Sequence, residues 1–142
     1  GDRKEVVTQA DLPYIISDVL SSNSVEDKVT VENYVLTHSK NLKPSVTLRI
    51  SIEGEVFEEH SQGDGQYDAF MNALKKVYKK KKQDLPALTD YTVHIPPGGK
   101  SDALCETIIT WSMNNRHFKT RGLDSDQTVS AIKATQKMLN LI

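Results

Sequence analysis

The chain has 142 residues, of which 37% are hydrophobic and 26% are charged, and its formal net charge is −1. This length and composition are typical of a globular domain with one hydrophobic core. The small net charge excludes a general electrostatic attraction to nucleic acid or to anionic membranes, so any basic site must be local. Since no apolar stretch approaches the roughly 20 residues of a membrane-spanning helix, we expect a soluble protein.

Cys105 is the only cysteine, which excludes an internal disulfide and a metal site built from several thiolates. This usage indicates a reducing compartment, and we expect the cytoplasm. The first residues, "GDRKEVVTQADLP", contain no apolar secretory segment and no initiator methionine. We therefore expect a piece of a longer protein.

The first predicted element is a short amphipathic helix over residues 8–20. Thr8 and Asp11 have the spacing of a helix start, and apolar residues then recur at helical spacing. The polar stretch "SSNSVED" follows and predicts a linker. These features indicate that residues 1–27 are a connecting segment ahead of the main body.

The main body begins with three strands and a helix. Apolar and polar residues alternate most clearly in "PSVTLRISIEG", and Glu53-Gly54 predicts a tight turn after it. The apolar positions change to helical spacing after residue 63. The predicted strands are "KVTVENYVLTHSK", "PSVTLRISI" and "EVFEEHS", and the predicted helix lies in "GDGQYDAFMNALKKVYKKKK".

The same order of elements repeats after "QDLPALTD". The predicted strands are "YTVHI", "LCETIITWSM" and "RHFKTRG", with a turn at Asn114-Asn115, and the predicted helix lies in "DSDQTVSAIKATQKMLNLI". Gly63 of the first half matches Gly122 of the second, at a period of about 60 residues. The sequence thus predicts an α+β fold of two βββα units, residues 28–84 and 85–142, related by a pseudo-twofold and each covering the other's open face.

Few residues suggest catalysis. The four histidines, His38, His60, His94 and His117, fall in strands or at their ends, without the spacing of a zinc site. Cys105 follows Leu104 in a strand, where a buried inert thiol is the usual case. We expect no catalytic residue and no metal ligand in this chain.

Two local patterns remain as candidate binding sites. The run "KKVYKKKKQ" ends a predicted helix, where lysines are favoured by the helix dipole, and we prefer a solvated helix end to a nucleic-acid patch. Glycines in "GDGQYDA" would let backbone N–H groups face an anion at a helix start, and "GLDSD" repeats this pattern. There, Asp124 or Ser125 is the expected cap and Asp126 lies in the first turn. Two such helix starts would suit a carboxylate.

Several of these motifs together resemble a known family. The runs "GDGQYDAFMNAL", "LTDYTVHIPPGGKSDAL", "ITW" and "FKTRGLDSDQTVSAIKATQKMLN" are similar to the C-terminal regulatory domain of 2-isopropylmalate synthase and its relative citramalate synthase. The likeness covers residues 28–142. It implies a dimer of two βββα units that binds an end-product amino acid as a feedback inhibitor, and residues 1–27 resemble the end of the connecting subdomain.

The resemblance also implies a site. The polar end of the inhibitor would be bound by Gly63, Asp64, Gly65, Tyr67 and Asp68. The apolar wall would be formed by Leu88, Tyr91 and Ile95, and the loop of Ser101, Asp102, Ala103 and Cys105 would close the pocket. The turn "PPGG" would hold Tyr91 and Ile95 opposite that loop, so that a branched side chain fits between them.

The parent enzyme implied by the resemblance is an acyltransferase. Its catalytic barrel, which uses a divalent metal to condense acetyl-CoA with 2-oxoisovalerate in leucine biosynthesis, has no counterpart in this chain, which needs no cofactor itself. The expected partners are leucine, a second copy of the chain and the barrel. Isoleucine, with citramalate synthase as the parent, stays open, as do a dimerisation-only module and a nucleic-acid binder.

Overall fold

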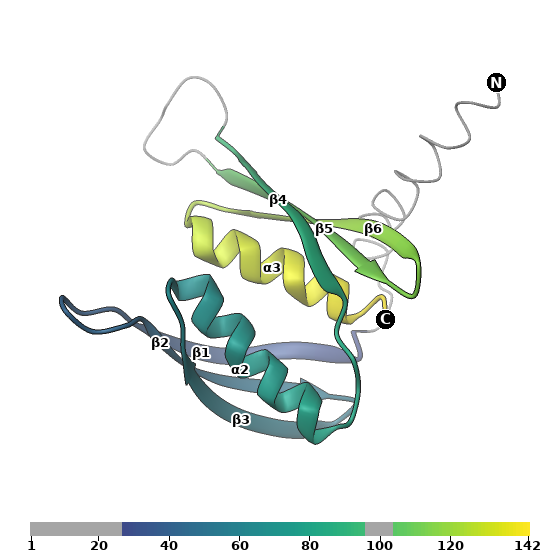
Figure 1. Ribbon diagram of the computed structural model, residues 1–142, viewed down its shortest axis with the longest axis horizontal. Coiled ribbons are helices and arrows are strands. Elements are labelled where there is room, and N and C mark those ends of the chain that lie inside the picture. The colour runs from purple at the N-terminus through teal and green to yellow at the C-terminus, as the bar shows by residue number, and fades with distance from the viewer. Residues whose placement is uncertain (1–26, 96–103) are drawn as a thin grey trace. The chain divides into compact units, whose positions relative to one another are not determined.

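The computed structural model describes residues 27–95 and 104–142 and places them in two compact units (Figure 1). The first unit is Asp27–Leu85 and the second begins at Pro86 and ends at Ile142. The helix expected over residues 8–20 lies outside the described residues. No described helix is long and apolar enough to cross a membrane.

In the first unit, three antiparallel strands are followed by one helix. Its elements are β1 Val29–Thr37, β2 Ser45–Ile52, β3 Glu55–Gln62 and α2 Gln66–Lys80, and the strand order is β1-β2-β3. The predicted alternation of β2 is confirmed, because Val46, Leu48 and Ile50 are buried while the residues between them are exposed or half-buried. The apolar stripe of α2, which includes Phe70 and Leu74, is buried as well.

The second unit repeats this plan. Its elements are β4 Ala87–His94, β5 Cys105–Met113, β6 Arg116–Asp124 and α3 Gln127–Leu139, and the strand order is β4-β5-β6. The predicted α+β class with two βββα units is therefore confirmed. In each unit the helix contacts the central and third strands most, namely α2 with β2 and β3, and α3 with β5 and β6.

The hairpin turns form where the sequence predicted them. Glu53 and Gly54 have φ of 49° and 86°, and Asn114 and Asn115 have φ of 52° and 64°. Two consecutive residues with positive φ are the requirement of the two-residue hairpin whose twist matches that of its strands. Glycine and asparagine adopt this conformation at low cost.

The internal repeat extends to strand irregularities. The pairing of β1 with β2 shifts between Val31 and Asn33, and that of β4 with β5 shifts between Leu88 and Asp90. Each bulge lies at the same point relative to the tyrosine that follows it, which is Tyr34 in β1 and Tyr91 in β4. The two units thus share strand register as well as element order.

Glycine permits a close approach of strand and helix in both units. A Cβ at Gly63 would lie 2.7 Å from the backbone carbon of Asp68, and one at Gly122 would lie 2.7 Å from the backbone nitrogen of Ala134. Their places differ, however. Gly63 follows β3, whereas Gly122 is inside β6, so the predicted match of the two as helix-start turns is wrong in register.

The start of β4 also differs from the prediction. We expected a strand over residues 91–95 after a connector, but β4 begins at Ala87 and ends at His94. The bulge at Thr89 interrupts the alternation of period two, so the sequence pattern did not predict the first four residues of the strand. Leu88 therefore belongs to the sheet.

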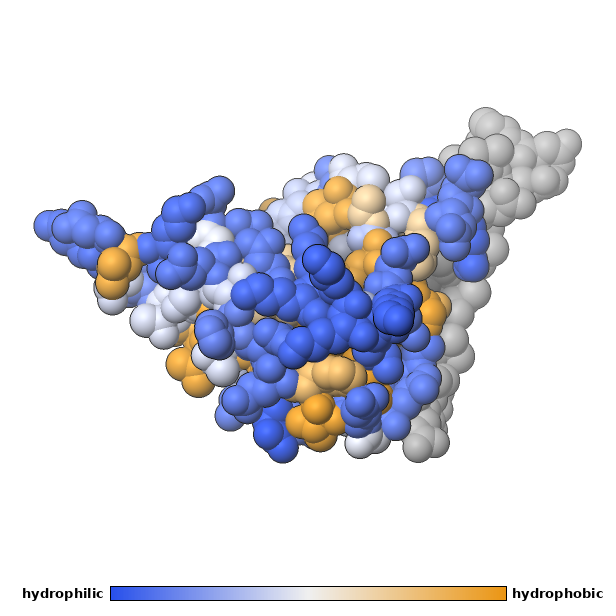
Figure 2. Space-filling view, turned by 60° about the horizontal axis from the view of Figure 1, so that its bottom comes forward, coloured by the Kyte–Doolittle hydropathy of each residue, from blue (hydrophilic) through white to orange (hydrophobic). Residues whose placement is uncertain are grey.

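Hydrophilic side chains dominate the face of the molecule seen in Figure 2, with apolar residues scattered among them. Large apolar side chains that remain exposed in the second unit include Leu88 at 40% and Ile95 at 66%. Scattered exposed apolar residues are ordinary, but these two belong to the predicted site: Leu88 lies near the start of β4, and Ile95 directly follows its last residue.

Candidate functional site

The predicted polar group lies at the start of α2. Gly65 is the N-cap residue and supplies no side-chain cap. Instead, the backbone N–H of Asp64 donates to Oδ2 of Asp68 in the first turn, at 2.9 Å. Lys43 lies 3.7 Å from the carboxylate of Asp64, and both side chains are exposed. This helix start therefore already carries a carboxylate of its own.

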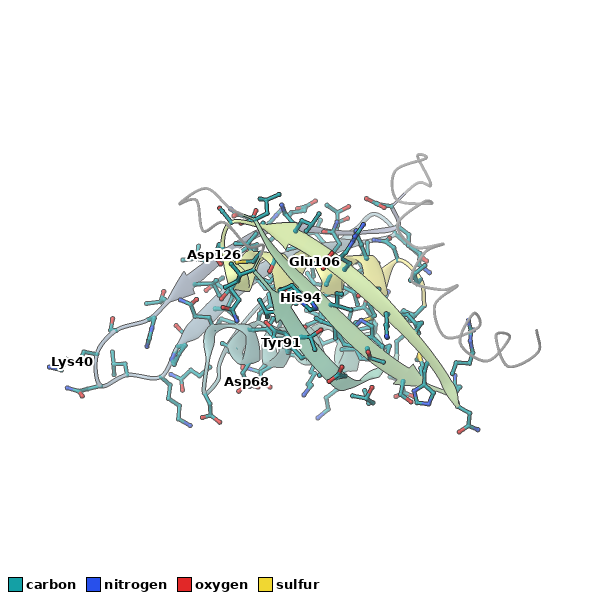
Figure 3. All side chains as sticks on the ribbon, turned by 90° about the horizontal axis from the view of Figure 1, so that it is seen from above. Lys40, Asp68, Tyr91, His94, Glu106 and Asp126 are labelled. Atoms are coloured by element: carbon teal, nitrogen blue, oxygen red, sulfur yellow. The ribbon has the colours of Figure 1, made fainter. Side chains whose placement is uncertain are left out.

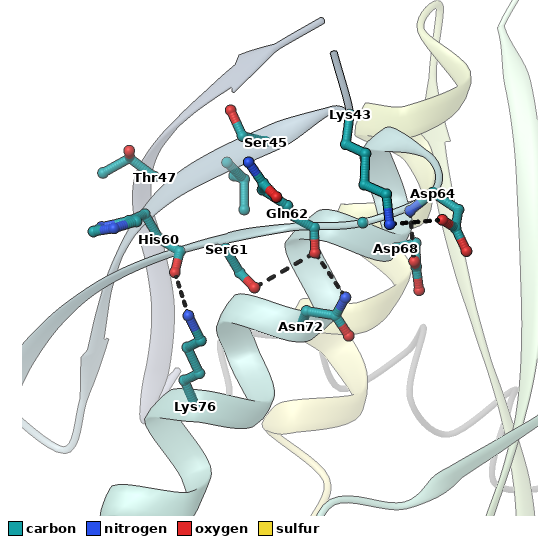
Figure 4. Close-up of a pocket in the computed structure, with 12 residues that line it drawn as sticks. Lys43, Ser45, Thr47, His60, Ser61, Gln62, Asp64, Asp68, Asn72 and Lys76 are labelled. Carbon is teal, nitrogen blue, oxygen red and sulfur yellow. Dashed lines mark hydrogen bonds and ion pairs between the residues drawn. The ribbon is translucent and has the colours of Figure 1, made fainter. Parts of the chain in front are cut away.

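Three residues of this group line an open depression of about 730 Å³ in the first unit (Figure 4). They are Gly63, Asp64 and Asp68, whereas Gly65 and Tyr67 are not among its lining residues. The other residues that line it are Lys43, Ser45, Val46, Thr47, His60, Ser61, Gln62, Asn72 and Lys76.

Two side chains of α2 in this depression bind the backbone of β3. Asn72 Nδ2 donates to the carbonyl of Gln62 at 2.9 Å, and Lys76 Nζ donates to the carbonyl of His60 at 2.8 Å (Figure 4). Sequence reasoning missed both residues, although their spacing of four places them on one face of the helix. Because they satisfy carbonyls at the sheet edge, their first role is to join α2 to β3.

The side chain of Tyr67 does not line the depression and contacts Phe70 instead. Its ring stacks on that of Phe70, with centroids 6.2 Å apart and an angle of 17° between the planes. The ring of Tyr34 meets the same Phe70 edge-on, also at 6.2 Å. Tyr67 is therefore part of an aromatic group that extends from β1 to the first turns of α2.

The predicted apolar wall lies on β4 and directly after it. Leu88 pairs with Trp111 and Tyr91 pairs with Ile109, so both face α3 with these buried partners. Ile95 follows the last residue of the strand, His94, which Figure 3 labels together with Tyr91. The second unit thus brings Leu88 and Tyr91 onto one face.

Tyr91 is half-buried and its hydroxyl is hydrogen-bonded. Burial raises the pKa of the Tyr91 phenol, a side-chain hydrogen bond with Gln127 partly opposes the rise, and Thr107 is a second hydrogen-bond partner. The phenol is therefore neutral at ordinary pH and keeps an O–H to donate. Gln127, the first residue of α3, and Thr107 of β5 are two polar neighbours that the sequence analysis did not identify.

The loop expected to close the pocket falls largely outside the described residues, since Ser101, Asp102 and Ala103 are not among them. Cys105 is described: it is the first residue of β5 and is half-buried. Its Sγ lies 3.8 Å from the carbonyl oxygen of Ser125, and its side chain shares the face of Thr107 and Ile109.

The start of α3 corrects the predicted cap. Asp126, not Asp124 or Ser125, is the N-cap residue, and its Oδ1 accepts from the N–H of Val129 at 2.9 Å. Asp124 instead ends β6 and accepts from the N–H of Asp126 at 2.8 Å. This bond and Lys133 hold the pKa of Asp124 below its ordinary value. Each of three neighbouring polar residues could have been the N-cap. Because β6 continues to Asp124, the helix begins after Asp126, which becomes the cap.

Three of the six lysines in the run over residues 75–83 contact β3. This favours the solvated helix end over a nucleic-acid patch, because the cations are partly neutralised locally. The contacts join Lys76 Nζ to the His60 carbonyl, Lys80 to the carboxylate of Glu59, and Lys81 to the carboxylate of Glu55 at 3.9 Å and the ring of Phe57 at 5.5 Å. Within the described ranges, histidine, cysteine and acidic residues form no cluster of three that could hold a metal ion.

Comparison with known proteins gives a consistent result. A family model described as the LeuA allosteric (dimerisation) domain matches residues 6–142. A putative (R)-citramalate synthase CimA of Archaeoglobus fulgidus is 30% identical over 142 residues, which are 100% of this chain and 28% of that protein. The 2-isopropylmalate synthase of Heliobacterium modesticaldum is also 30% identical over 142 residues, 100% of this chain and 26% of that protein. That of Methanocaldococcus jannaschii is 27% identical over 143 residues, 100% of this chain and 27% of that protein. The chain thus spans about a quarter of the length of these relatives.

Proposed function

The chain belongs to the LeuA allosteric (dimerisation) domain family, and from this we propose that it is the feedback-regulatory domain of a 2-isopropylmalate synthase. It binds leucine at a dimer interface and inhibits a catalytic barrel elsewhere in the parent protein. The observation that carries the proposal is that β4 presents the partly exposed Leu88 on the same face as the hydrogen-bonded Tyr91, with the exposed Ile95 directly after the strand.

The apolar group suits a branched aliphatic side chain. Leu88 and Ile95 are exposed enough to contact a ligand, and Tyr91, which lies between them along β4, adds the flat surface of a ring. Burying a leucine-sized side chain is worth roughly 1.5–3 kcal/mol, which separates leucine from alanine. We assign the ligand's apolar end to this group.

For the polar end of an amino acid, the resemblance proposes the start of α2 in the first unit. Asp64 and Asp68 supply carboxylates and Gly65 a backbone N–H, whereas the N–H groups of Gly63 and Asp64 already donate to the Pro44 carbonyl and to Asp68. The Asp68 carboxylate would pair with the ligand's ammonium, and the backbone N–H of Gly65 would bind its carboxylate.

Isoleucine is the second candidate, with a citramalate synthase as the parent. Two similar relatives carry these two enzyme names, and the chain is 30% identical to each of them. Leucine and isoleucine are isomers with nearly equal transfer energies, so the shape of the pocket decides between them.

In the parent protein, we propose a cytoplasmic acyltransferase of branched-chain amino acid biosynthesis. Its barrel would hold a divalent metal and condense acetyl-CoA with 2-oxoisovalerate. The family's description as a dimerisation domain supports a homodimer. Inhibition then requires that leucine bind one arrangement of the dimer more tightly than the arrangement in which the barrel is active.

The test is a melting-temperature screen of the 142-residue chain with leucine, isoleucine, valine and alanine, followed by calorimetry on each ligand that stabilises it. A ligand that binds only the folded state raises the melting temperature in proportion to its concentration over Kd. A rise with leucine alone supports the proposal, and a rise with isoleucine alone moves the assignment to citramalate synthase. No rise with any of them favours a dimerisation-only module.

A matched pair of variants locates the site. Leu88→Ala removes a side chain that is 40% exposed on the face toward α3, and Leu123→Ala removes one that is 43% exposed on the opposite face of the sheet. We expect Leu88→Ala to weaken leucine binding about tenfold and Leu123→Ala to leave it unchanged. Equal effects of the two substitutions would remove Leu88 from the site.

A further inference from the structure

A chain of hydroxyl groups is buried in the second unit. Thr107 of β5 and Ser130 of α3 are both 0% exposed. The Oγ1 atom of Thr107 lies 2.5 Å from the Oγ atom of Ser130, which in turn donates to the backbone carbonyl of Gln127 at 2.8 Å. Tyr91 pairs with Ile109, so it lies on the same face of the sheet as Thr107 two residues earlier in β5, and its side chain is hydrogen-bonded to Thr107 and Gln127.

The direction of the hydrogen bonds follows from counting protons. Each hydroxyl carries one proton, and that of Ser130 is given to the Gln127 carbonyl. Thr107 must therefore donate to Ser130, which leaves its oxygen as an acceptor for the O–H of Tyr91. The order is Tyr91 to Thr107 to Ser130 to the first turn of α3.

The first unit has no such hydroxyl chain at the matching positions. Tyr34 of the first unit corresponds to Tyr91, because it pairs with Leu48 as Tyr91 pairs with Ile109. The residue two positions before the partner is Val46 in the first unit and Thr107 in the second. The fourth residue after the N-cap is Ala69 in α2 and Ser130 in α3. Since aliphatic residues build the same βββα unit there, the fold does not require hydroxyl groups at these two places.

We infer that Thr107 and Ser130 are positioning residues that fix the ring of Tyr91 for the amino-acid ligand and connect it to α3. The inference rests on the proposed function, in which Tyr91 is part of the apolar wall. A hydroxyl buried in the core costs free energy unless it is hydrogen-bonded, so this series of hydrogen bonds holds the Tyr91 side chain in one orientation. A ring that is already oriented loses less conformational freedom when a ligand binds.

The test replaces each hydroxyl by the residue that the first unit carries. Thr107→Val keeps the shape of the side chain and removes the hydrogen bonds, and Thr107→Ser restores the hydroxyl as a control. We expect Thr107→Val to weaken the binding of leucine, measured by calorimetry on the folded dimer, by about tenfold, and Thr107→Ser to stay within about threefold of the unchanged chain. Ser130→Ala is expected to act like Thr107→Val.

A second readout separates positioning from packing. In protein labelled with 3-fluorotyrosine, the ¹⁹F resonance of Tyr91, assigned by its loss in Tyr91→Phe, should shift in Thr107→Val and return in Thr107→Ser without any ligand. Unchanged affinity and an unchanged resonance in Thr107→Val would overturn the inference, as would equal losses in the valine and serine variants. If the unchanged chain binds none of the four amino acids, the proposed function fails and the ligand role of the two hydroxyls fails with it.

Discussion

Trp111 donates its indole N–H to the hydroxyl of Thr120 at 2.9 Å, and both side chains are fully buried. The hydroxyl of Thr120 in turn donates a hydrogen bond to the carbonyl of Ala134 in α3, at 2.7 Å. One threonine thereby joins two strands and a helix through the centre of the second unit. Valine has nearly the same shape as threonine but lacks the hydroxyl. Comparing threonine with valine at position 120 therefore tests what these hydrogen bonds contribute to stability.

Thr120→Val should lower the free energy of unfolding by about 1–3 kcal/mol, because it leaves the indole N–H and a helix carbonyl buried without this partner. Urea unfolding followed by the fluorescence of Trp111, the only tryptophan of the chain, measures the loss. Thr120→Ser keeps the hydroxyl and should lose less. Equal stability of Thr120→Val and the unchanged protein would show that the hydrogen bonds contribute nothing net.

Gly122→Ala should destabilise the second unit by about 3 kcal/mol, since the added Cβ meets backbone atoms of Ser130 and Ala134, which cannot move aside singly. Gly65→Ala is the control: no atom lies within 4 Å of its Cβ position, and its φ of −140° suits any residue. Chemical denaturation of both variants compares them. A Gly122→Ala protein as stable as Gly65→Ala would contradict the close approach of β6 and α3.

Asp126→Ala should cost about 0.5–2 kcal/mol of stability, because α3 loses the side-chain acceptor for the N–H of Val129. Ser125→Ala, one residue earlier and exposed, is expected to have almost no effect. Thermal unfolding distinguishes the two variants. A larger loss for Ser125→Ala would return the cap to Ser125, one of the two residues that the sequence pattern suggested.

Tyr78→Phe should change the response of stability to alkaline pH. Burial, with a smaller contribution from Glu53, raises the pKa of Tyr78 to about 12 from the ordinary value of 10.0. The unfolded chain therefore loses this proton at lower pH than the folded one, so the contribution of Tyr78 is complete below pH 10 and is lost as pH rises toward 12. Urea unfolding at pH 9 and pH 11 should show a smaller loss of stability in Tyr78→Phe than in the unchanged protein. Parallel losses would contradict the raised pKa.

Much of the fold could be predicted because it depends on patterns between near neighbours in the sequence. The alternation of Val46, Leu48 and Ile50 defines β2, and the spacing of Phe70 and Leu74 defines the buried stripe of α2. Residues that accept positive φ, at Gly54 and Asn115, set the hairpins. Each of these signals lies within a few residues, so it survives without knowledge of what packs against it.

The candidate site was predicted less completely. The resemblance supplied Leu88 and Tyr91, and the structure places both on one face of β4. Thr107 and Gln127, the polar neighbours of Tyr91, gave no signal, because they come from a different strand and a helix. The depression beside α2 is likewise lined by residues far apart in the sequence, such as Lys43 and Lys76, so no local pattern predicts it.

The sequence by itself determined the order of strands and helices, their repeat and the family. Tertiary structure decided which polar residue became the cap of α3, where β4 began, and that Tyr91 is hydrogen-bonded to Thr107, which in turn is hydrogen-bonded to Ser130. The reason is physical: periodicity reports which face of an element is buried, whereas a hydrogen bond depends on where two distant segments bring single atoms within about 3 Å.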